Sequence, residues 1–175
     1  LVSSLLFLMV LSLAIGSDRG DVLGVSFISF LAPGLIAMQV IQQSFSHSSS
    51  TFMIGKIQGN IVDLLYAPLS AAEVTISIAL ASATRSFMIA IISIITFYFI
   101  VDIQIKYFFL LFLFTFLTSF ILGNIGIISG LWAEKFDHQA TITNFVIVPL
   151  SFLSGTFYSI ERLPGFLKTI SEVNP

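Results

Sequence analysis

Long apolar runs alternate with short polar segments along the whole chain. The runs have the length of membrane-spanning helices, because about 20 apolar residues at about 1.5 Å each cross a hydrocarbon core of about 30 Å. They predict about five spans, over residues 1–15, 22–43, 71–101, 107–132 and 141–158. The pattern therefore predicts an all-α membrane protein, a polytopic helical bundle that forms a single transmembrane domain over residues 1–175.

The first run is too short for a complete span. Residues 1–15 reach only about 22 Å as a helix. A signal-peptide core has a similar length, but no basic segment precedes this run and no small-residue cleavage site follows it. We therefore interpret the run as the end of a span, and we expect the sequence to be a fragment with both termini missing.

Prolines fall within two of the predicted spans. Pro33 and Gly34 interrupt the second run, and Pro149 interrupts the last. Such residues kink a membrane helix, provided that neighbouring groups satisfy the freed carbonyl. Three glutamines close the second run and the serine-rich segment "SFSHSSST" follows, so we expect residues 44–73 to form a polar loop.

Within this loop, residues 55–66 have the pattern of a two-faced helix. Its apolar side consists of Ile57, Ile61, Leu64 and Leu65, and its polar side of Lys56, Asn60 and Asp63. Such a helix lies along a membrane surface with its apolar side in lipid or on the bundle. The pattern alone fits equally a linker helix on the headgroups and a docking helix for a soluble protein.

The third predicted span carries a helix-start signal. Ser70 and Glu73 fit the capping box, in which the serine hydroxyl accepts from the amide three residues on and the glutamate accepts from the serine amide. Pro68 comes just before this box. We therefore expect a helix to begin at Ala71, directly after a short and stiff link.

The last segment, residues 159–175, is predicted not to cross the membrane. It contains Pro164 and Gly165, and four charged residues: Glu161, Arg162, Lys168 and Glu172. Since a charge at the centre of a bilayer costs about 2.5–3.5 kcal/mol or more, the segment fits a re-entrant or interfacial hairpin.

Composition agrees with a lipid environment and excludes several functions. Hydrophobic residues make up 57% of the chain and charged residues 9%, against about 25% in soluble domains. The net charge of −2 gives no reason to expect a nucleic-acid partner. The sequence has no cysteine and no P-loop, and its two histidines, His47 and His138, lie in predicted loops. We expect no enzyme activity, no metal site and no cofactor in this chain.

Arg85 is the one charge inside an apolar run, in "ASATRSFMIA". A charge within a membrane span is by default a functional hypothesis. Two interpretations remain open. The arginine either anchors its helix by extending to the nearer membrane surface, which the sequence places only several Å away, or lines a polar translocation path.

Three ordered motifs resemble the membrane subunit of type-2 ABC transporters, in the general exporter branch. They are "FLAPGLIAMQV", "GKIQGNIVDLLYAPLSAAEV" and "SFLSGTFYSIERLPGFLKTISEVNP", and together they extend over most of the chain. The resemblance implies six spans, a cytoplasmic 44–73 loop containing a coupling helix, and an outer re-entrant hairpin at residues 159–175.

The same resemblance implies the partners. Two permease subunits, as a homodimer or heterodimer, would span a bacterial inner membrane, and two separate ATPase subunits would bind ATP. The ATPase would contact Lys56, Asn60, Asp63 and Leu64. The chain would then be the permease of an exporter for a drug-like, lipidic or glycan solute. A self-sufficient channel or secondary transporter is the alternative, although it would need more intramembrane ionisable residues than Arg85.

Charge counting opposes the orientation that the resemblance implies. The 44–73 and 133–139 loops carry Lys56 and Lys135, whereas the opposite side carries Arg19, Lys106, Arg162 and Lys168. The positive-inside rule would make the second side cytoplasmic. We follow the ordered motifs, because the count rests on six residues.

Overall fold

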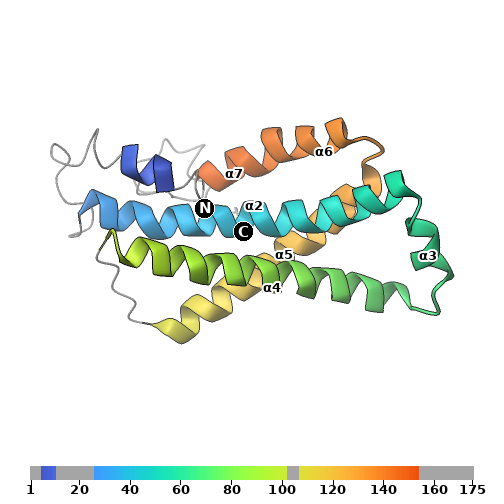
Figure 1. Ribbon diagram of the computed structural model, residues 1–175, viewed down its shortest axis with the longest axis horizontal. Helices are drawn as coiled ribbons and strands as arrows, with labels where there is room; N and C mark the ends of the chain where they lie inside the picture. Colours follow the sequence, from blue (N-terminus) through green and yellow to red (C-terminus); the bar gives the residue numbers. More distant parts are fainter. Residues whose placement is uncertain (1–4, 11–25, 102–106, 154–175) are drawn as a thin grey trace, which may run out of the picture.

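The computed structural model describes residues 5–10, 26–101 and 107–153, and these segments contain helices and no strands (Figure 1). Three helices are long and apolar enough to cross a membrane: α2 (Phe27–Gln58), α4 (Ala71–Tyr98) and α5 (Phe108–Trp132). The chain is therefore a polytopic helical membrane protein, as the apolar pattern predicts.

The long helices run up and down beside one another. The short helix α3 (Ile61–Tyr66) joins α2 to α4 at one end of the bundle. From that same end α6 (Phe136–Ile142), the π-helical turn η1 (Thr143–Ile147) and α7 (Val148–Leu153) run back along α2 (Figure 1). We call residues 59–70 the elbow and this end of the bundle the elbow end.

Helix α2 is the centre of the packing. It contacts α4 and α5, which also contact each other, and it meets η1 and α7 on another side. Its 32 residues correspond to about 48 Å, so it is longer than the hydrocarbon core. Part of α2 therefore extends beyond the lipid at one or both ends.

The prediction that residues 44–58 belong to a polar loop is wrong, because the structure continues α2 through them. Helix formation satisfies several of their hydroxyl groups, although the buried Ser48 hydroxyl has no hydrogen-bond partner among the described residues. Ser44 donates to the Val40 carbonyl at 2.8 Å, and Ser49 to the Phe45 carbonyl at 2.9 Å, each one turn back. Ser44, Ser48 and Ser49 are also buried against neighbouring helices, so the polar residues of this segment do not indicate a solvent-exposed loop. His47 consequently lies on α2 and not in a loop.

The prediction of one helix over residues 55–66 is also wrong. Helix α2 ends at Gln58, and Gly59 has a φ of 77°, a left-handed conformation that favours glycine. Its amide donates to the Lys56 carbonyl at 3.3 Å. The chain then starts α3 in a new direction, so Lys56 and Asp63 do not share one helix face.

The other boundaries agree more closely. Helices α4 and α5 lie where the third and fourth spans are predicted. The predicted 133–139 loop is shorter in the structure, since α6 begins at Phe136. The fifth span is helical from 136 to 153, with a π-helical turn immediately before the region of Pro149. The predicted hairpin at 159–175 lies outside the described residues.

The bundle has two differently built halves. The apolar half contains a hydrophobic cluster from residues 5–10, α2, α4 and the segment just after α4: Leu8, Phe27, Leu31, Ala32, Leu35, Ile36, Val40, Ala90, Phe97 and Val101. The serine–glycine half comprises residues 44–58, 71–86 and 119–132 and lies toward the elbow end. There small residues bring α5 against α2: a Cβ at Gly126 would lie 2.5 Å from the Phe45 carbonyl oxygen.

Candidate functional site

The elbow is the first candidate site, and two apolar side chains attach it to the bundle. Ile61 and Leu64 of α3 pack against a cluster that contains Phe52 of α2, together with Val74 of α4. The structure thus turns Leu64 toward the bundle, although the sequence expectation placed it on the ATPase-contacting surface.

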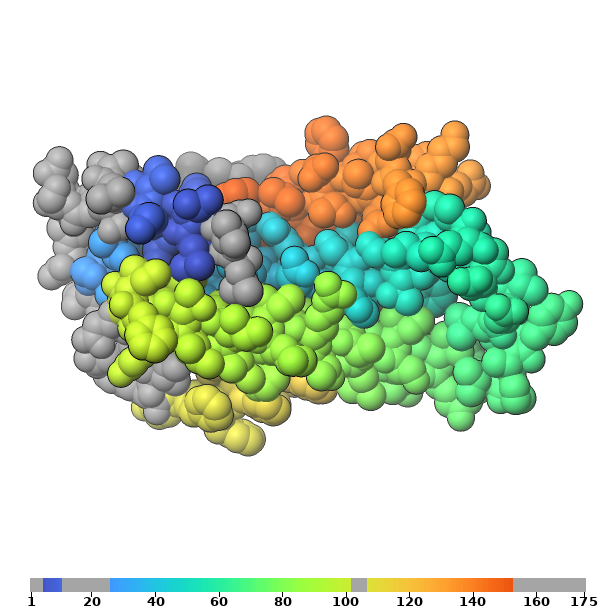
Figure 2. Space-filling model, in the orientation of Figure 1, coloured from blue at the N-terminus to red at the C-terminus, as the bar shows by residue number. Residues whose placement is uncertain are grey.

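The outward side of α3 is exposed and partly apolar. Leu65 is 78% exposed and Tyr66 86% exposed, and Val62 and Asp63 also face outward. Leu65 belongs to the side that was expected to lie in lipid or on the bundle, and in the structure it is exposed whereas Leu64 packs against the bundle. We call Val62, Asp63, Leu65 and Tyr66 the elbow face; α3 projects at one end of the molecule in Figure 2. Exposed apolar groups clustered with a charge are typical of protein-binding surfaces.

The two other predicted contact residues lie beside this face. Asn60 is exposed, and its amide donates to the Gln58 side chain at 3.2 Å. Lys56 instead points to the end of α5, where its ammonium donates to the carbonyls of Gly130 at 2.9 Å, Ala133 at 3.0 Å, and Leu131. A cation at a helix C-terminus is favourable because the last carbonyls lack intrahelical partners.

The predicted cap at the start of α4 has the expected geometry. The Ser70 hydroxyl accepts from the Glu73 amide at 3.3 Å, and the Glu73 carboxylate accepts from the Ser70 amide at 2.7 Å. This box fixes the direction in which α4 leaves the elbow. The elbow is therefore held at both ends, by Gly59 with Lys56 on one side and by the Ser70 cap on the other.

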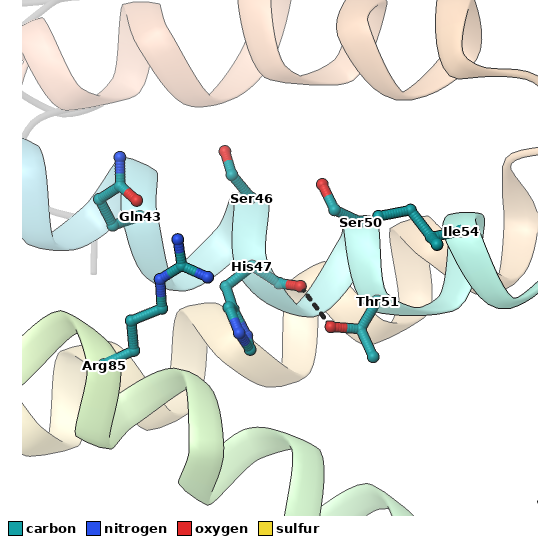
Figure 3. Close-up of a pocket in the computed structure, with 7 residues that line it drawn as sticks. All are labelled: Gln43, Ser46, His47, Ser50, Thr51, Ile54 and Arg85. Atoms are coloured by element: carbon teal, nitrogen blue, oxygen red, sulfur yellow. Dashed lines mark hydrogen bonds between the residues drawn. The ribbon is translucent and has the colours of Figure 1, made fainter.

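A polar cleft on α2 is the second candidate site (Figure 3). It has a volume of about 310 Å³, and Arg85 from α4 lines it opposite a row of α2 residues: Gln43, Ser46, His47, Ser50, Thr51 and Ile54. The arginine side chain crosses from α4 to α2, and its guanidinium lies between Gln43 and His47.

Hydrogen bonds between helices hold the walls of this region. The hydroxyl groups of Ser44 and Ser86 are hydrogen-bonded at 2.7 Å and so join α2 to α4 next to Arg85. On the other side, Gln139 of α6 donates to Ser49 at 2.8 Å and to Ser50 at 3.0 Å. The sequence did not predict these contacts, because residues 44–51 and residue 139 were expected in loops. Within the described residues, no group of acidic or histidine side chains could hold a metal ion.

Comparison with known proteins gives one consistent result. The family described as "ABC-2 type transporter" matches residues 1–175. The inner membrane transport permease YadH of Escherichia coli strain K12 is 31% identical over 174 residues, which are 99% of this chain and 68% of that protein. Nodulation protein J of Neorhizobium galegae is 24% identical over 180 residues, covering 100% of this chain and 67% of that protein. No solved structure matches significantly.

Proposed function

Because the chain belongs to the ABC-2 type transporter family and is an inner-membrane transport permease by this relationship, we propose that it moves solute outward under the drive of a separate cytoplasmic ATPase. The ATPase docks on the elbow face, and the elbow end is cytoplasmic. Two copies, or this chain and a related one, form the transmembrane path.

One observation carries this proposal: the elbow presents an exposed face while it is rigidly attached behind. Leu65 and Tyr66 offer apolar surface, and Asp63 offers a carboxylate for charge-assisted hydrogen bonds to a cationic partner. The face combines apolar and aromatic residues with a polar one, as protein interfaces do, in which a hydrophobic core is surrounded by a polar rim.

The attachments behind the face support a transmitting role. Leu64 holds α3 to α2 and α4, and Lys56 joins the end of α2 to the end of α5. A displacement of the elbow therefore acts on three long helices together. Rigid displacement of packed helices is one of the known ways in which a small movement at one site opens another.

A self-sufficient channel or secondary transporter is the competing function. Coupling to an ion gradient uses ionisable groups inside the membrane. The described carboxylates are Asp63, Glu73, Glu134 and Asp137, and all belong to the elbow or to the start of α4 and α6. Arg85 is the only charged residue described in the middle of a span, which favours the ATP-driven function.

The test is co-purification of the full-length permease with its ATPase, combined with transport-coupled ATP hydrolysis. We expect Asp63→Lys to weaken docking at least ten-fold, since hydrogen bonds to charged groups contribute about 1.5–3 kcal/mol and about 1.4 kcal/mol is one decade. Tyr66→Ala should also weaken docking, and because Tyr66 is 86% exposed its removal leaves the bundle intact.

Asp102→Lys serves as the control, because Asp102 comes after α4 in the sequence whereas the elbow comes before it. It should leave docking unchanged. A normal complex and normal coupled hydrolysis in both elbow variants would contradict the docking assignment. Tighter membrane association of Asp63→Lys without loss of docking would favour the headgroup-resting helix, since an added lysine is attracted to anionic lipid.

A further inference from the structure

Arg85 occupies a depth at which an unpaired charge requires an explanation. About 20 Å of α4 lies on either side of it, in a helix of about 42 Å. If a core of about 30 Å lies within that length, Arg85 is at least about 9 Å inside the hydrocarbon, wherever the core is placed. The sequence alone placed Arg85 only several Å below one membrane surface, because the helix was expected to continue to residue 101. In the structure α4 ends at Tyr98, which places Arg85 deeper.

Nothing described in the chain neutralises this arginine. No carboxylate lines the cleft, and the nearest described carboxylate along α4 is Glu73, about 18 Å away by helix rise. The side chain of Arg85 is exposed, and it is directed into the cleft. A guanidinium in such a place normally pairs with an anion, because unpaired charge in a medium of low dielectric is costly.

The cleft contains further polar groups besides the arginine. The side-chain amide of Gln43 and the hydroxyl of Ser46 lie along the same row of α2 (Figure 3). Nδ1 of His47 is buried and has no hydrogen-bond partner among the described residues. Of these groups, Gln43 lies beside the guanidinium, whereas the Ser46 hydroxyl points away from Arg85 and the buried Nδ1 of His47 is not accessible to a ligand.

The walls leave this row open on one side. Residues of α2 are visible in Figure 2 between α4 and the α6–α7 segment, along the face that carries the cleft. Ile54 lines the cleft toward the elbow end, and the exposed side chains of α4 next to Arg85 include the apolar Met88. A polar floor with apolar borders suits a molecule that has a charged head and an apolar tail.

We propose that this cleft binds the phosphate group of an amphipathic molecule, with Arg85 as the principal contact and the side-chain amide of Gln43 as a supporting donor. A guanidinium binds phosphate through two parallel hydrogen bonds, which explains an arginine here in preference to a lysine. The molecule is either a transported amphiphile or a resident anionic lipid, which present the same chemistry. The inference rests on the permease function proposed above, but not on the docking of the ATPase.

Binding of dodecyl phosphate to the full-length permease alone, purified in neutral detergent, tests the site. Dodecyl glucoside, which has the same chain and no charge, is the comparison ligand. We expect Arg85→Gln to weaken dodecyl phosphate binding at least ten-fold, and Arg85→Lys to weaken it less, because the lysine keeps the charge and loses the paired geometry. Lys135→Gln removes a positive charge from an exposed residue outside the cleft and should change nothing.

Gln43→Leu is a second variant that leaves the arginine in place, and it should weaken phosphate binding several-fold. Binding of dodecyl glucoside should be the same in every variant. Equal affinity of the wild type, Arg85→Gln and Gln43→Leu for dodecyl phosphate would overturn the proposal. So would a wild type that does not prefer the phosphate over the glucoside. Because the ATPase is absent from this measurement, failure of the docking proposal cannot produce either result.

Two further arms identify the source of the phosphate group. For a transported amphiphile, dodecyl phosphate should change the rate of ATP hydrolysis by the wild-type complex and not by the Arg85→Gln complex. For a resident lipid, hydrolysis should not respond, and phosphatidylglycerol in phosphatidylcholine nanodiscs should raise the unfolding temperature of the wild type but not of Arg85→Gln. If neither response depends on Arg85, the site is not a functional phosphate site and the proposal fails.

Discussion

The two halves of the bundle are held together by opposite means. In the apolar half, α2 and α4 are separated by large side chains such as Phe27, Leu31 and Phe97, which fill the space between them. In the serine–glycine half the backbones themselves meet, because Gly126 and Gly130 of α5 lie against Phe45 and Ser49 of α2. The buried residues of α5 begin only at Ser119, although Phe112 nearer its start also packs edge-on against Phe87 of α4.

This difference has a mechanical consequence. Lipid is as apolar as a leucine side chain, so helices in a membrane gain little from hydrophobic burial and depend on close packing and hydrogen bonds. Large side chains can change rotamer and repack, whereas two touching backbones can only move together. We therefore expect the half beside the elbow to move as one body and the apolar half to accommodate that movement.

Removal of a large side chain should be most harmful in the apolar half. Phe97→Ala should create a cavity of about 100 Å³, and at about 24 cal/mol per Å³ this lowers the free energy of unfolding by about 2–3 kcal/mol. Phe109→Ala is the matched control, since Phe109 is 73% exposed whereas Phe97 is 1% exposed. Thermal unfolding in detergent should show a clear decrease for Phe97→Ala and almost none for Phe109→Ala. Equal decreases would mean that the apolar cluster does not hold this half.

Addition of a methyl group should be most harmful in the serine–glycine half. Gly126→Ala forces a contact with a backbone carbonyl that cannot move away, and such overpacking costs about 1–3 kcal/mol. Gly55→Ala is the control, because a Cβ there meets nothing closer than 3.9 Å. Alanine also favours a helix over glycine by about 1 kcal/mol, so Gly55→Ala should be neutral or stabilising. A neutral Gly126→Ala would show that α2 and α5 are not in close backbone contact.

The sequence predicts the apolar half better than the serine–glycine half. Helix lengths follow from apolar runs, and the capping box of Ser70 and Glu73 follows from a local pattern. The continuation of α2 past Ser44 could not be predicted locally, since serines are compatible with a helix here only because small residues of α5 and the side chain of Ser86 meet them. The same limit applies to glycine: Gly55 lies inside α2 and Gly59 ends it, although their neighbourhoods are equally polar.

The candidate sites also combine features that follow from the local sequence with features that depend on the packing. Asp63 and Asn60 are exposed, as a two-faced helix would have them. The expected stripe placed Leu64 and Leu65 on one apolar side, whereas Leu64 packs against the bundle and Leu65 is exposed, because the stripe assumes one uninterrupted helix and the chain turns at Gly59. Arg85 could be singled out from its lone charge, but its neighbours Gln43 and His47 come from another helix and only the packing brings them together.

Lys56 provides the smallest and most specific test of the rigid half. Its ammonium donates to carbonyls at the C-terminal end of α5, and it thereby links α2, which precedes the elbow, to α5, which precedes α6. Lys56→Met keeps much of the side-chain length and removes the donors, so the free energy of unfolding should fall by about 1–2 kcal/mol. Lys135→Met removes an exposed charge at the same end and should have less effect.

The decisive measurement for Lys56 is local. Amide hydrogen exchange should become faster in the last turn of α5, around Leu131 to Ala133, while the first turn of α4 keeps the protection that its own cap provides. If the elbow drives three helices as one body, Lys56→Met should also lower ATP hydrolysis coupled to transport while the ATPase still co-purifies. Faster exchange with unchanged coupling would assign Lys56 a purely structural role. Loss of the ATPase would instead place its side chain in the docking surface, as the sequence alone suggests.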